Sequence, residues 1–270
     1  SIYAQYRVFQ LAKQSGVTVT LDGQGADELL GGYAGYPGQR LRSLIEKGRL
    51  GEARDFLNQW SQWPGRSRKL GVQQLMAEYA QGPLYDALRR LSGRSDTPTW
   101  LDAKALEERG IVCRYPRQRA VPQESGRRLV AELALSLTRR GLPSLLRHGD
   151  RNSMRFSVES GVPFLTLDLA DLLLSLPESF LISPQGETKH VFREAMRGIV
   201  PDAVLDRRDK IGFSTPEHEW LSSMAQTAQG WLRDSSDLPF IRKDDMLKQF
   251  GRIVSGERVF SWQAWRWINF

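Results

Sequence analysis

The chain has 270 residues, a net charge of +7 and a sequence pI of about 9.7; 40% of its residues are hydrophobic and 26% are charged. This is the ordinary composition of a soluble globular protein, with enough residues for one large domain or two small ones. No apolar run approaches the ~20 residues that span a bilayer, and the first residues lack the layout of a signal peptide, so we expect neither a membrane protein nor a secreted one.

A short strand between a helix and an acidic loop is predicted in the first 36 residues. Residues 1–15 carry apolar side chains at helical spacing, and Gly16 ends the pattern. Residues 17–21, Val-Thr-Val-Thr-Leu, are rich in β-branched side chains and predict a strand buried in a parallel sheet. Because one parallel strand needs a neighbour, we expect its partners upstream of Ser1.

From residue 37 onward the pattern is mostly helical. Residues 92–125 form an irregular connection around one short helix, residues 206–216 form a polar loop, and the tail from residue 216 is helical and rich in tryptophan. Helices are expected at residues 50–60, 70–91 with a break near Pro83, 101–109, 124–140, 141–154, 167–176 and 188–197, with Thr188 capping the last.

The single cysteine and the basic residues give weaker signals. Cys113 cannot form an internal disulfide, which is typical of a reducing compartment, so we expect a cytoplasmic protein. Basic residues are scattered, and no basic run exceeds a pair such as Arg207-Arg208. A positive balance suits nucleic acid, but it suits a site for nucleotide phosphates equally well.

Histidine and tryptophan spacings favour ordinary structural roles. His148, His190 and His218 are far apart in the sequence and lack paired metal-ligand spacing, so each is predicted to be an ordinary helix residue. Trp262 and Trp265 are three residues apart and would share one helix face, which indicates packing rather than base stacking.

Residues 22–28 gather carboxylates and glycines just after the predicted strand. In open α/β sheets, ligands bind beyond this end of the strands. Gly23 and Gly25 allow tight backbone angles, while Asp22, Asp27 and Glu28 offer the oxygen ligands that hold Mg²⁺ beside phosphate. A plain strand-to-helix turn, in which Asp27 and Glu28 serve the helix dipole, explains the spacing equally well.

Three blocks of the sequence together resemble the asparagine synthetase family. Residues 23–33, Gly-Gln-Gly-Ala-Asp-Glu-Leu-Leu-Gly-Gly-Tyr, meet every specified position of its signature G-[EQ]-G-[AS]-D-E-x-x-G-G-Y. Residues 150–166 resemble the block D-R-x-S-M-x-x-S-[VI]-E-x-R-V-P-F-L-D. Residues 186–189 and 208–216 resemble G-x-T-K followed by R-x-K-x-G-F-x-x-P.

The resemblance implies an α/β fold, an adenine-nucleotide α-hydrolase-like (Rossmann-like) synthetase domain of which this chain is the mostly helical carboxy-terminal part. Residues 1–36 would hold a sheet strand and the acidic loop, and residues 37–270 the helical remainder. The 270 residues contain neither the family's amino-terminal glutaminase domain nor its S-G-G-x-D-S loop for ATP. We therefore expect the parent protein's chemistry to be missing from this fragment alone.

The implied reaction is amidation of aspartate to asparagine, with ATP and Mg²⁺ as cofactors. The carboxylate attacks the α-phosphorus of ATP, which gives an acyl-adenylate and Mg-pyrophosphate, and ammonia from glutamine then attacks the acyl carbon. The resemblance implies that Asp22, Gly23 and Gln24 contact ATP and that Asp27 holds the metal ion of Mg-pyrophosphate.

Lys210, Glu159 and Gln24 are the implied catalytic residues. Lys210 would stabilise charge on pyrophosphate or on the reacting carboxyl group. Glu159 would lie near the substrate amine or ammonia. Gln24 stands where many relatives carry glutamate, and it would act through hydrogen bonds because an amide is no base.

Two departures from the family pattern leave the substrate open. Gly161 replaces the usual arginine, and Thr166 replaces the usual aspartate after Pro-Phe-Leu. A related amidotransferase acting on another carboxylate, such as a sugar acid, is therefore an alternative. A helical interaction or nucleic-acid module would suit the charge of +7 but leaves the three blocks unexplained. We expect small-molecule substrates and a glutaminase domain as partners, with no nucleic acid and no membrane; a homodimer stays open.

Overall fold

A computed structural model describes residues 2–79, 98–111, 125–208 and 215–269. The chain divides into two compact units: unit 1 comprises Ser1–Pro83 and Ala120–Phe213, and unit 2 comprises Leu84–Arg119 and Ser214–Phe270. Three residues singled out in the sequence, Pro83, Cys113 and Lys210, lie outside the described residues.

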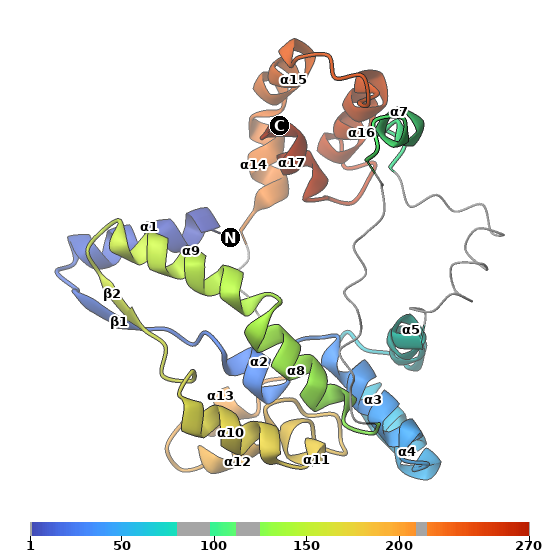
Figure 1. Ribbon diagram of the computed structural model, residues 1–270. Coiled ribbons are helices and arrows are strands. Elements are labelled where there is room, and N and C mark those ends of the chain that lie inside the picture. Colours follow the sequence, from blue (N-terminus) through green and yellow to red (C-terminus); the bar gives the residue numbers. More distant parts are fainter. Residues whose placement is uncertain (1, 80–97, 112–124, 209–214, 270) are drawn as a thin grey trace. The chain divides into compact units, whose positions relative to one another are not determined.

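Unit 1 is mostly helical and contains a two-stranded sheet (Figure 1). Helix α1 packs against α9, and α3 packs against α4, α5 and α8. The elements of this unit are α1 (Ile2–Gln14), β1 (Val19–Leu21), α2 (Ala26–Leu30), α3 (Tyr36–Glu46), α4 (Leu50–Trp60), α5 (Arg68–Tyr79), α8 (Arg128–Thr138), α9 (Leu142–Met154), β2 (Glu159–Gly161), α10 (Leu167–Ser175), α11 (Glu178–Leu181), α12 (His190–Ala195) and α13 (Asp202–Leu205).

The predicted strand finds a parallel partner within the chain. Strand β1 pairs with β2, with Val19 opposite Glu159 and Leu21 opposite Gly161. Two further backbone hydrogen bonds extend the ladder, from Glu159 N to Thr18 O and from Asp22 N to Gly161 O, both at 2.8 Å. The expectation that all partners lie upstream of Ser1 is therefore wrong, because β2 supplies one neighbour.

The burial predicted for this strand is also wrong in the described structure. Val19 is 54% exposed and Leu21 is 77% exposed. A parallel strand is buried only when helices cover both faces of its sheet and neighbours flank both edges. Among the described residues β1 has β2 as its neighbour, and that leaves apolar side chains of β1 uncovered.

The core of unit 1 forms where α2, α3, α4, α8, α10 and α11 meet. The short helix α2 places Leu29 and Leu30 in it, and α8 adds Leu129 and Leu133 at the four-residue spacing of one helix face. Full burial of each such side chain contributes about 1.5–3 kcal/mol. This apolar cluster therefore anchors α2, the helix that follows the acidic loop.

A buried carboxylate connects three helices of this core. Glu178, at the start of α11, accepts hydrogen bonds from Arg40 Nη1 at 3.1 Å and Ser43 Oγ at 3.0 Å, both on α3. The same carboxylate accepts from the backbone amides of Leu129 at 2.9 Å and Val130 at 3.3 Å, at the start of α8. A helix N-terminus favours an anion, so Glu178 serves both as the partner of Arg40 and as the capping group of α8.

A second carboxylate, Glu46, supports the chain just before α8. It accepts from Arg128 Nε at 2.7 Å, from Arg42 Nε at 2.9 Å and from the backbone amide of Gly126 at 2.9 Å. Burial of Glu46 opposes its ionisation, but these hydrogen bonds outweigh that effect and hold the pKa of Glu46 below its usual value. Gly126 has φ +82°, which is not helical, so α8 begins at Arg128 rather than at residue 124.

Most other predicted helices are confirmed within a few residues. The patterns at residues 1–15, 50–60, 141–154 and 167–176 correspond to α1, α4, α9 and α10. Two short helices, α11 and α13, were not predicted, because four residues are too few to show a helical period. Helix α12 begins at His190 rather than at residue 188, because Lys189 before it has left-handed backbone angles.

Unit 2 is helical and has its own core. Trp267 and Phe250 are buried in it, and Trp265 packs against it, as the tryptophan pattern predicts, whereas Trp262 is 57% exposed and does not fulfil the prediction. Among the helices described, none is both long and apolar enough to cross a membrane. The elements of this unit are α7 (Ala103–Glu107), α14 (Glu217–Ser223), α15 (Ala225–Asp234), α16 (Lys243–Val254) and α17 (Gln263–Ile268).

The hydrogen bonds to Glu46 predict acid sensitivity. Because the folded state lowers the pKa of Glu46, its contribution to stability is complete above the ordinary value of 4.5 and is lost as the pH falls through the lower folded value. Glu46→Gln should lower the free energy of unfolding near neutral pH by about 1–3 kcal/mol and flatten the loss of stability in acid. Urea unfolding across the pH range measures both effects.

The matched control for this prediction is Glu52→Gln. Glu52 lies on α4, where it is 58% exposed and forms a helix-surface pair with Arg49 at 3.4 Å. Such a pair contributes little, so this variant should keep the parent's acid profile. Identical acid profiles for Glu46→Gln and the parent would contradict the role assigned to Glu46.

Candidate active site

The acidic loop at residues 22–28 turns sharply between β1 and α2. Gly25 has φ +90°, and a Cβ added there would lie 2.2 Å from Leu165 Cδ2. Only glycine satisfies both the backbone angle and the close approach. The acidic loop and the Pro-Phe-Leu segment, far apart in the sequence, are therefore in direct contact.

Asp27 forms an ion pair with Lys189. The distance from Lys189 Nζ to Asp27 Oδ1 is 2.9 Å, and the two side chains are 30% and 27% exposed. Gly32 lies against this pair, since a Cβ added there would be 1.8 Å from Asp27 Oδ1 and 2.7 Å from Lys189 Cε. The ion pair therefore joins the acidic loop to the third sequence block, and Gly32 provides the space for it.

The backbone of Lys189 is in the left-handed region, with φ 58° and ψ 28°. This conformation is about 1–2 kcal/mol unfavourable for a residue with a side chain, and such strain is common at functional sites. Lys189 N donates to Leu30 O at 3.1 Å, which holds the strained residue against the end of α2. Because Lys189 takes the position before α12 and no side chain caps that helix, the prediction that Thr188 caps it is wrong.

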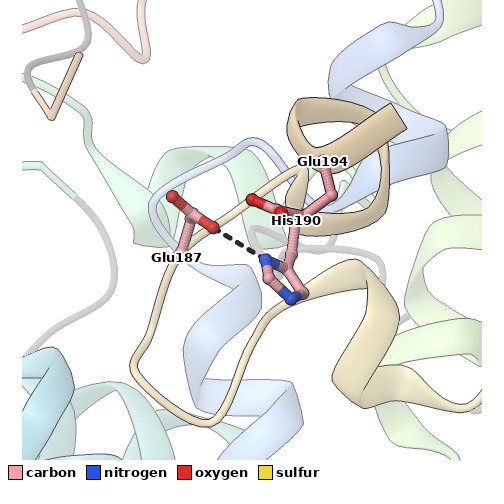
Figure 2. A group of neighbouring side chains, drawn as sticks. All are labelled: Glu187, His190 and Glu194. Atoms are coloured by element: carbon pink, nitrogen blue, oxygen red, sulfur yellow. Dashed lines mark hydrogen bonds and ion pairs between the residues drawn. The ribbon is translucent and has the colours of Figure 1, made fainter. Parts of the chain in front are cut away.

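A tight turn presents Lys189. Ile182 and Thr188 form an antiparallel bridge, and Ser183 N donates to Glu187 O at 2.9 Å. The Ser183 hydroxyl accepts from the backbone amide of Glu187 at 3.2 Å. The Glu187 carboxylate then lies 2.7 Å from His190 Nδ1 (Figure 2). Hydrogen bonds therefore determine the path of the chain on both sides of Lys189.

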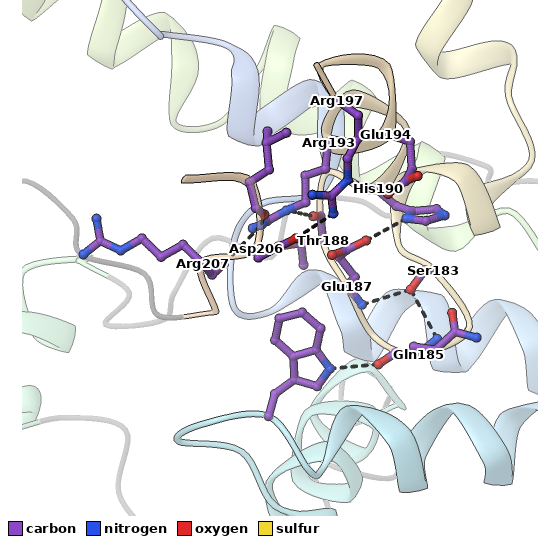
Figure 3. Close-up of polar contacts among 12 residues, drawn as sticks. Ser183, Gln185, Glu187, Thr188, His190, Arg193, Glu194, Arg197, Asp206 and Arg207 are labelled. Carbon is purple, nitrogen blue, oxygen red and sulfur yellow. Dashed lines mark hydrogen bonds and ion pairs between the residues drawn. The ribbon is translucent and has the colours of Figure 1, made fainter. Parts of the chain in front are cut away.

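A hollow of about 500 Å³ opens beside this turn. The Arg208 guanidinium lies over the ring of Trp63 at 5.1 Å, within range of a cation–π contact. Trp63 Nε1 in turn donates to Gln185 O at 2.9 Å, which joins α4's end to the turn. Figure 3 shows the polar contacts among residues of the turn, of α12 and of the segment around Asp206. The hollow is lined by Trp63, Ser183, Gln185, Glu187, His190, Asp206 and Arg208.

Glu28 has a structural partner rather than an open ligand position. It is 2% exposed, and its Oε1 accepts from the Tyr33 hydroxyl at 2.7 Å. Burial of Tyr33 and this hydrogen bond raise the pKa of the Tyr33 hydroxyl. Of the two adjacent acidic residues in the loop, Asp27 is therefore the better placed to meet a ligand.

The other sequence-predicted site residues are spread along the two strands and the loop. Asp22 and Gln24 are half-buried and Gly23 is exposed in the loop. Glu159 is exposed at the start of β2, opposite Val19. Asp22 follows Val19 by three positions, so the register puts Glu159 about 10 Å along the strand from the level of Asp22. The structure thus does not bring Glu159 to the acidic loop.

Lys189, the partner of Asp27, is the residue of this candidate site that sequence reasoning did not single out. Lys189 lies within the quoted G-x-T-K block, but the sequence assigned it no role. The block itself was the only available signal, since an ion pair between residues 162 positions apart has no local pattern. Lys210, which the sequence singled out instead, lies outside the described residues, two positions after Arg208.

Gly32→Ala tests whether the ion pair occupies the space seen here. The added methyl group would collide with Asp27 and Lys189, so the pair must separate, and we expect a loss of about 1–3 kcal/mol in the free energy of unfolding. Gly35→Ala is the matched control, because its added methyl group meets no atom within 4 Å. Urea unfolding of both variants is the measurement. Equal stabilities of Gly32→Ala and Gly35→Ala would show that the ion pair does not lie against Gly32.

Comparison with known proteins agrees with the convergence of the three blocks. The chain matches the family described as asparagine synthase over residues 1–270. It is 28% identical over 260 residues to asparagine synthetase [glutamine-hydrolyzing] 1 of Bacillus subtilis (strain 168), an alignment that covers 90% of this chain and 38% of that relative. The chain thus spans well under half the length of that relative, and no solved structure matches it at a significant level. Because the family match extends over all 270 residues, the chain belongs to the asparagine synthase family.

Proposed function

We propose that this chain is the carboxy-terminal part of the synthetase domain of an enzyme that amidates aspartate to asparagine, with ATP and with ammonia from glutamine. The observation that carries the proposal is the Asp27–Lys189 ion pair, at 2.9 Å, which joins Lys189 to the loop and helix that follow the carboxyl end of parallel strand β1. Ligands of α/β sheets bind at this end, and the parallel pairing of β1 and β2 supports a Rossmann-like fold.

Asp27 and Lys189 together suit a magnesium-bound pyrophosphate. A partly exposed carboxylate is a hard oxygen ligand of the kind that Mg²⁺ takes beside phosphate, and the ammonium group of Lys189 can neutralise phosphate charge. Mg²⁺ bound here would stabilise the charge that develops on the leaving pyrophosphate. The hydrogen bond from Lys189 N to Leu30 O supports this role, because it holds the strained residue beside the end of α2, within reach of Asp27.

The acidic loop is proposed to contact ATP through Asp22, Gly23 and Gln24. Gly23 is exposed, and no atom lies within 4 Å of where its Cβ would be, so a ligand can approach the backbone there. Gln24 would act through hydrogen bonds rather than as a base. Glu159 and Lys210 remain proposed catalytic residues on the resemblance, and Arg208 beside the hollow supports a functional role for the segment that leads to Lys210.

A different carboxylate is the second candidate substrate. Gly161 replaces the family's usual arginine, and its backbone lies next to the acidic loop, since its carbonyl oxygen accepts from Asp22 N at 2.8 Å. A cation at that place suits recognition of a second carboxylate group. The replacement of this arginine therefore makes another carboxylate, such as a sugar acid, the alternative to aspartate, and the rate assay can be run with both classes.

Asp27→Asn and Lys189→Ala test the proposed site in the intact protein. Each should lower ATP-dependent pyrophosphate release about 10²–10³-fold, because each removes one electrostatic contact to the charged group. The double variant should lose much less than the product of the two single losses, because the two side chains act as one unit. Rates are measured at saturating ATP and Mg²⁺.

The control for this assay is Glu52→Gln, which breaks an exposed ion pair of similar length on α4. It should leave the rate unchanged. Near-normal turnover in both Asp27→Asn and Lys189→Ala would mean that the ion pair only supports the fold. If aspartate fails as substrate while another carboxylate supports release, the site is retained and the substrate class is corrected.

A further expectation concerns the 270 residues by themselves. They contain no S-G-G-x-D-S loop, so the purified chain should not convert ATP to AMP and pyrophosphate when aspartate, ammonia and Mg²⁺ are supplied. Chromatographic detection of AMP is the measurement, and circular dichroism verifies that the sample is folded. AMP formation above the background without enzyme would overturn the expectation.

A further inference from the structure

One imidazole and two carboxylates meet at the start of α12 (Figure 2). Glu187, His190 and Glu194 each offer a ligand atom, and these atoms all lie within 4.8 Å of one another. His190 and Glu194 are four positions apart on α12 and share one helix face, and the turn before the helix brings Glu187 to within 2.7 Å of His190. We propose that this cluster, called the Glu-His-Glu cluster here, binds one divalent transition-metal ion such as Zn²⁺.

The donor set decides the class of ion. Mg²⁺ favours oxygen ligands, whereas one imidazole nitrogen with two carboxylate oxygens suits Zn²⁺ and its neighbours in the first transition row. With metal–ligand bonds of about 2.0–2.2 Å, tetrahedral ligand atoms lie about 3.4 Å apart, so small side-chain rotations bring the cluster to bonding geometry. Three protein ligands leave a fourth position for water or for a ligand from the hollow, which Glu187 and His190 also line.

Neighbouring arginines do not compete strongly for these carboxylates. Arg193 Nε donates to the backbone oxygen of Thr188 at 3.0 Å, and Arg193 Nη1 donates to that of Arg207 at 3.1 Å. Arg197 donates to Asp202 at 2.9 Å and to Asp206 at 2.6 Å. Its contact with Glu194 is longer, at 3.7 Å. The cations around α12 are thus largely held by other groups, which leaves the cluster able to accept a positive ion.

The competing explanation is a plain hydrogen-bonded pair on a helix surface. His190 and Glu187 lie 2.7 Å apart and are 32% and 20% exposed, so a proton can occupy the space that a metal ion would take. Such a pair needs no third ligand. Glu194 is 55% exposed, and in this explanation its position beside His190 is incidental. The two explanations therefore differ in what Glu194 does.

Metal binding would also restrain the backbone around Lys189. Glu187 and His190 flank Lys189 in the sequence, and the ion would join them across the strained residue. The cluster is nevertheless distinct from Asp27, whose partner is Lys189 Nζ. The inference therefore does not depend on the proposed function, and Asp27→Asn should keep the metal site intact.

Titration of the purified protein with Zn²⁺ by calorimetry tests the inference, and Co²⁺ provides an absorption spectrum of the same site. We expect saturable binding that His190→Ala and Glu194→Gln each weaken at least 10–100-fold, since loss of even a supporting residue has that effect at metal sites. His148→Ala on α9 and Glu52→Gln on α4 are the matched controls and should bind as the parent does. Circular dichroism verifies that each variant is folded.

The outcomes separate the explanations. Selective loss in His190→Ala and Glu194→Gln, with Asp27→Asn binding normally, supports the Glu-His-Glu cluster. Equal binding by all variants would place the ion elsewhere and overturn the inference. Loss in His190→Ala but not in Glu194→Gln would overturn it in favour of a two-residue pair, and absence of saturable binding in the parent would overturn it outright.

Discussion

The buried carboxylate of Glu178 accepts hydrogen bonds from α3 and from the first amides of α8, and this contact determines where the candidate site can form. Removing one partner of such a buried pair typically destabilises a protein by about 3–5 kcal/mol, so the three helices are tightly constrained. Helix α11 then leads directly into Ile182, which is fully buried and contacts Gly31 at the end of α2. The turn that carries Lys189 begins at this point.

At the candidate site, close packing and polar contacts hold a strained backbone in place. Lys189 takes a left-handed conformation that a residue with a side chain normally avoids. The hydrogen bond from its amide to Leu30 and its ion pair with Asp27 hold it there. Gly32 makes room for both side chains. The two glycines after α2 therefore both serve the site. Gly31 ends the helix at positive φ, and Gly32 leaves room for the ion pair.

The charged side chains around α12 have different kinds of partner. Arg193 donates hydrogen bonds to backbone oxygens, and Arg197 donates to the aspartates of the α13 segment. Lys189 forms its ion pair with Asp27, and the Glu187–His190 pair lines the hollow. The proposed phosphate contact at Lys189 and the proposed metal ligands Glu187, His190 and Glu194 therefore lie on one short segment but have different partners.

Local sequence signals predicted most helices, the acidic loop and the family, and they singled out Asp27, because periodicity, glycine positions and short motifs act over a few residues. The pairing of β1 with Glu159–Gly161 had no such signal, since three residues of Glu-Ser-Gly do not show a strand pattern. Lys189 as the partner of Asp27, the exposure of β1 and the Glu178 contacts likewise became visible only in the tertiary structure. Each joins residues at least 48 positions apart or depends on which elements cover a surface, and neither property is encoded in a local pattern.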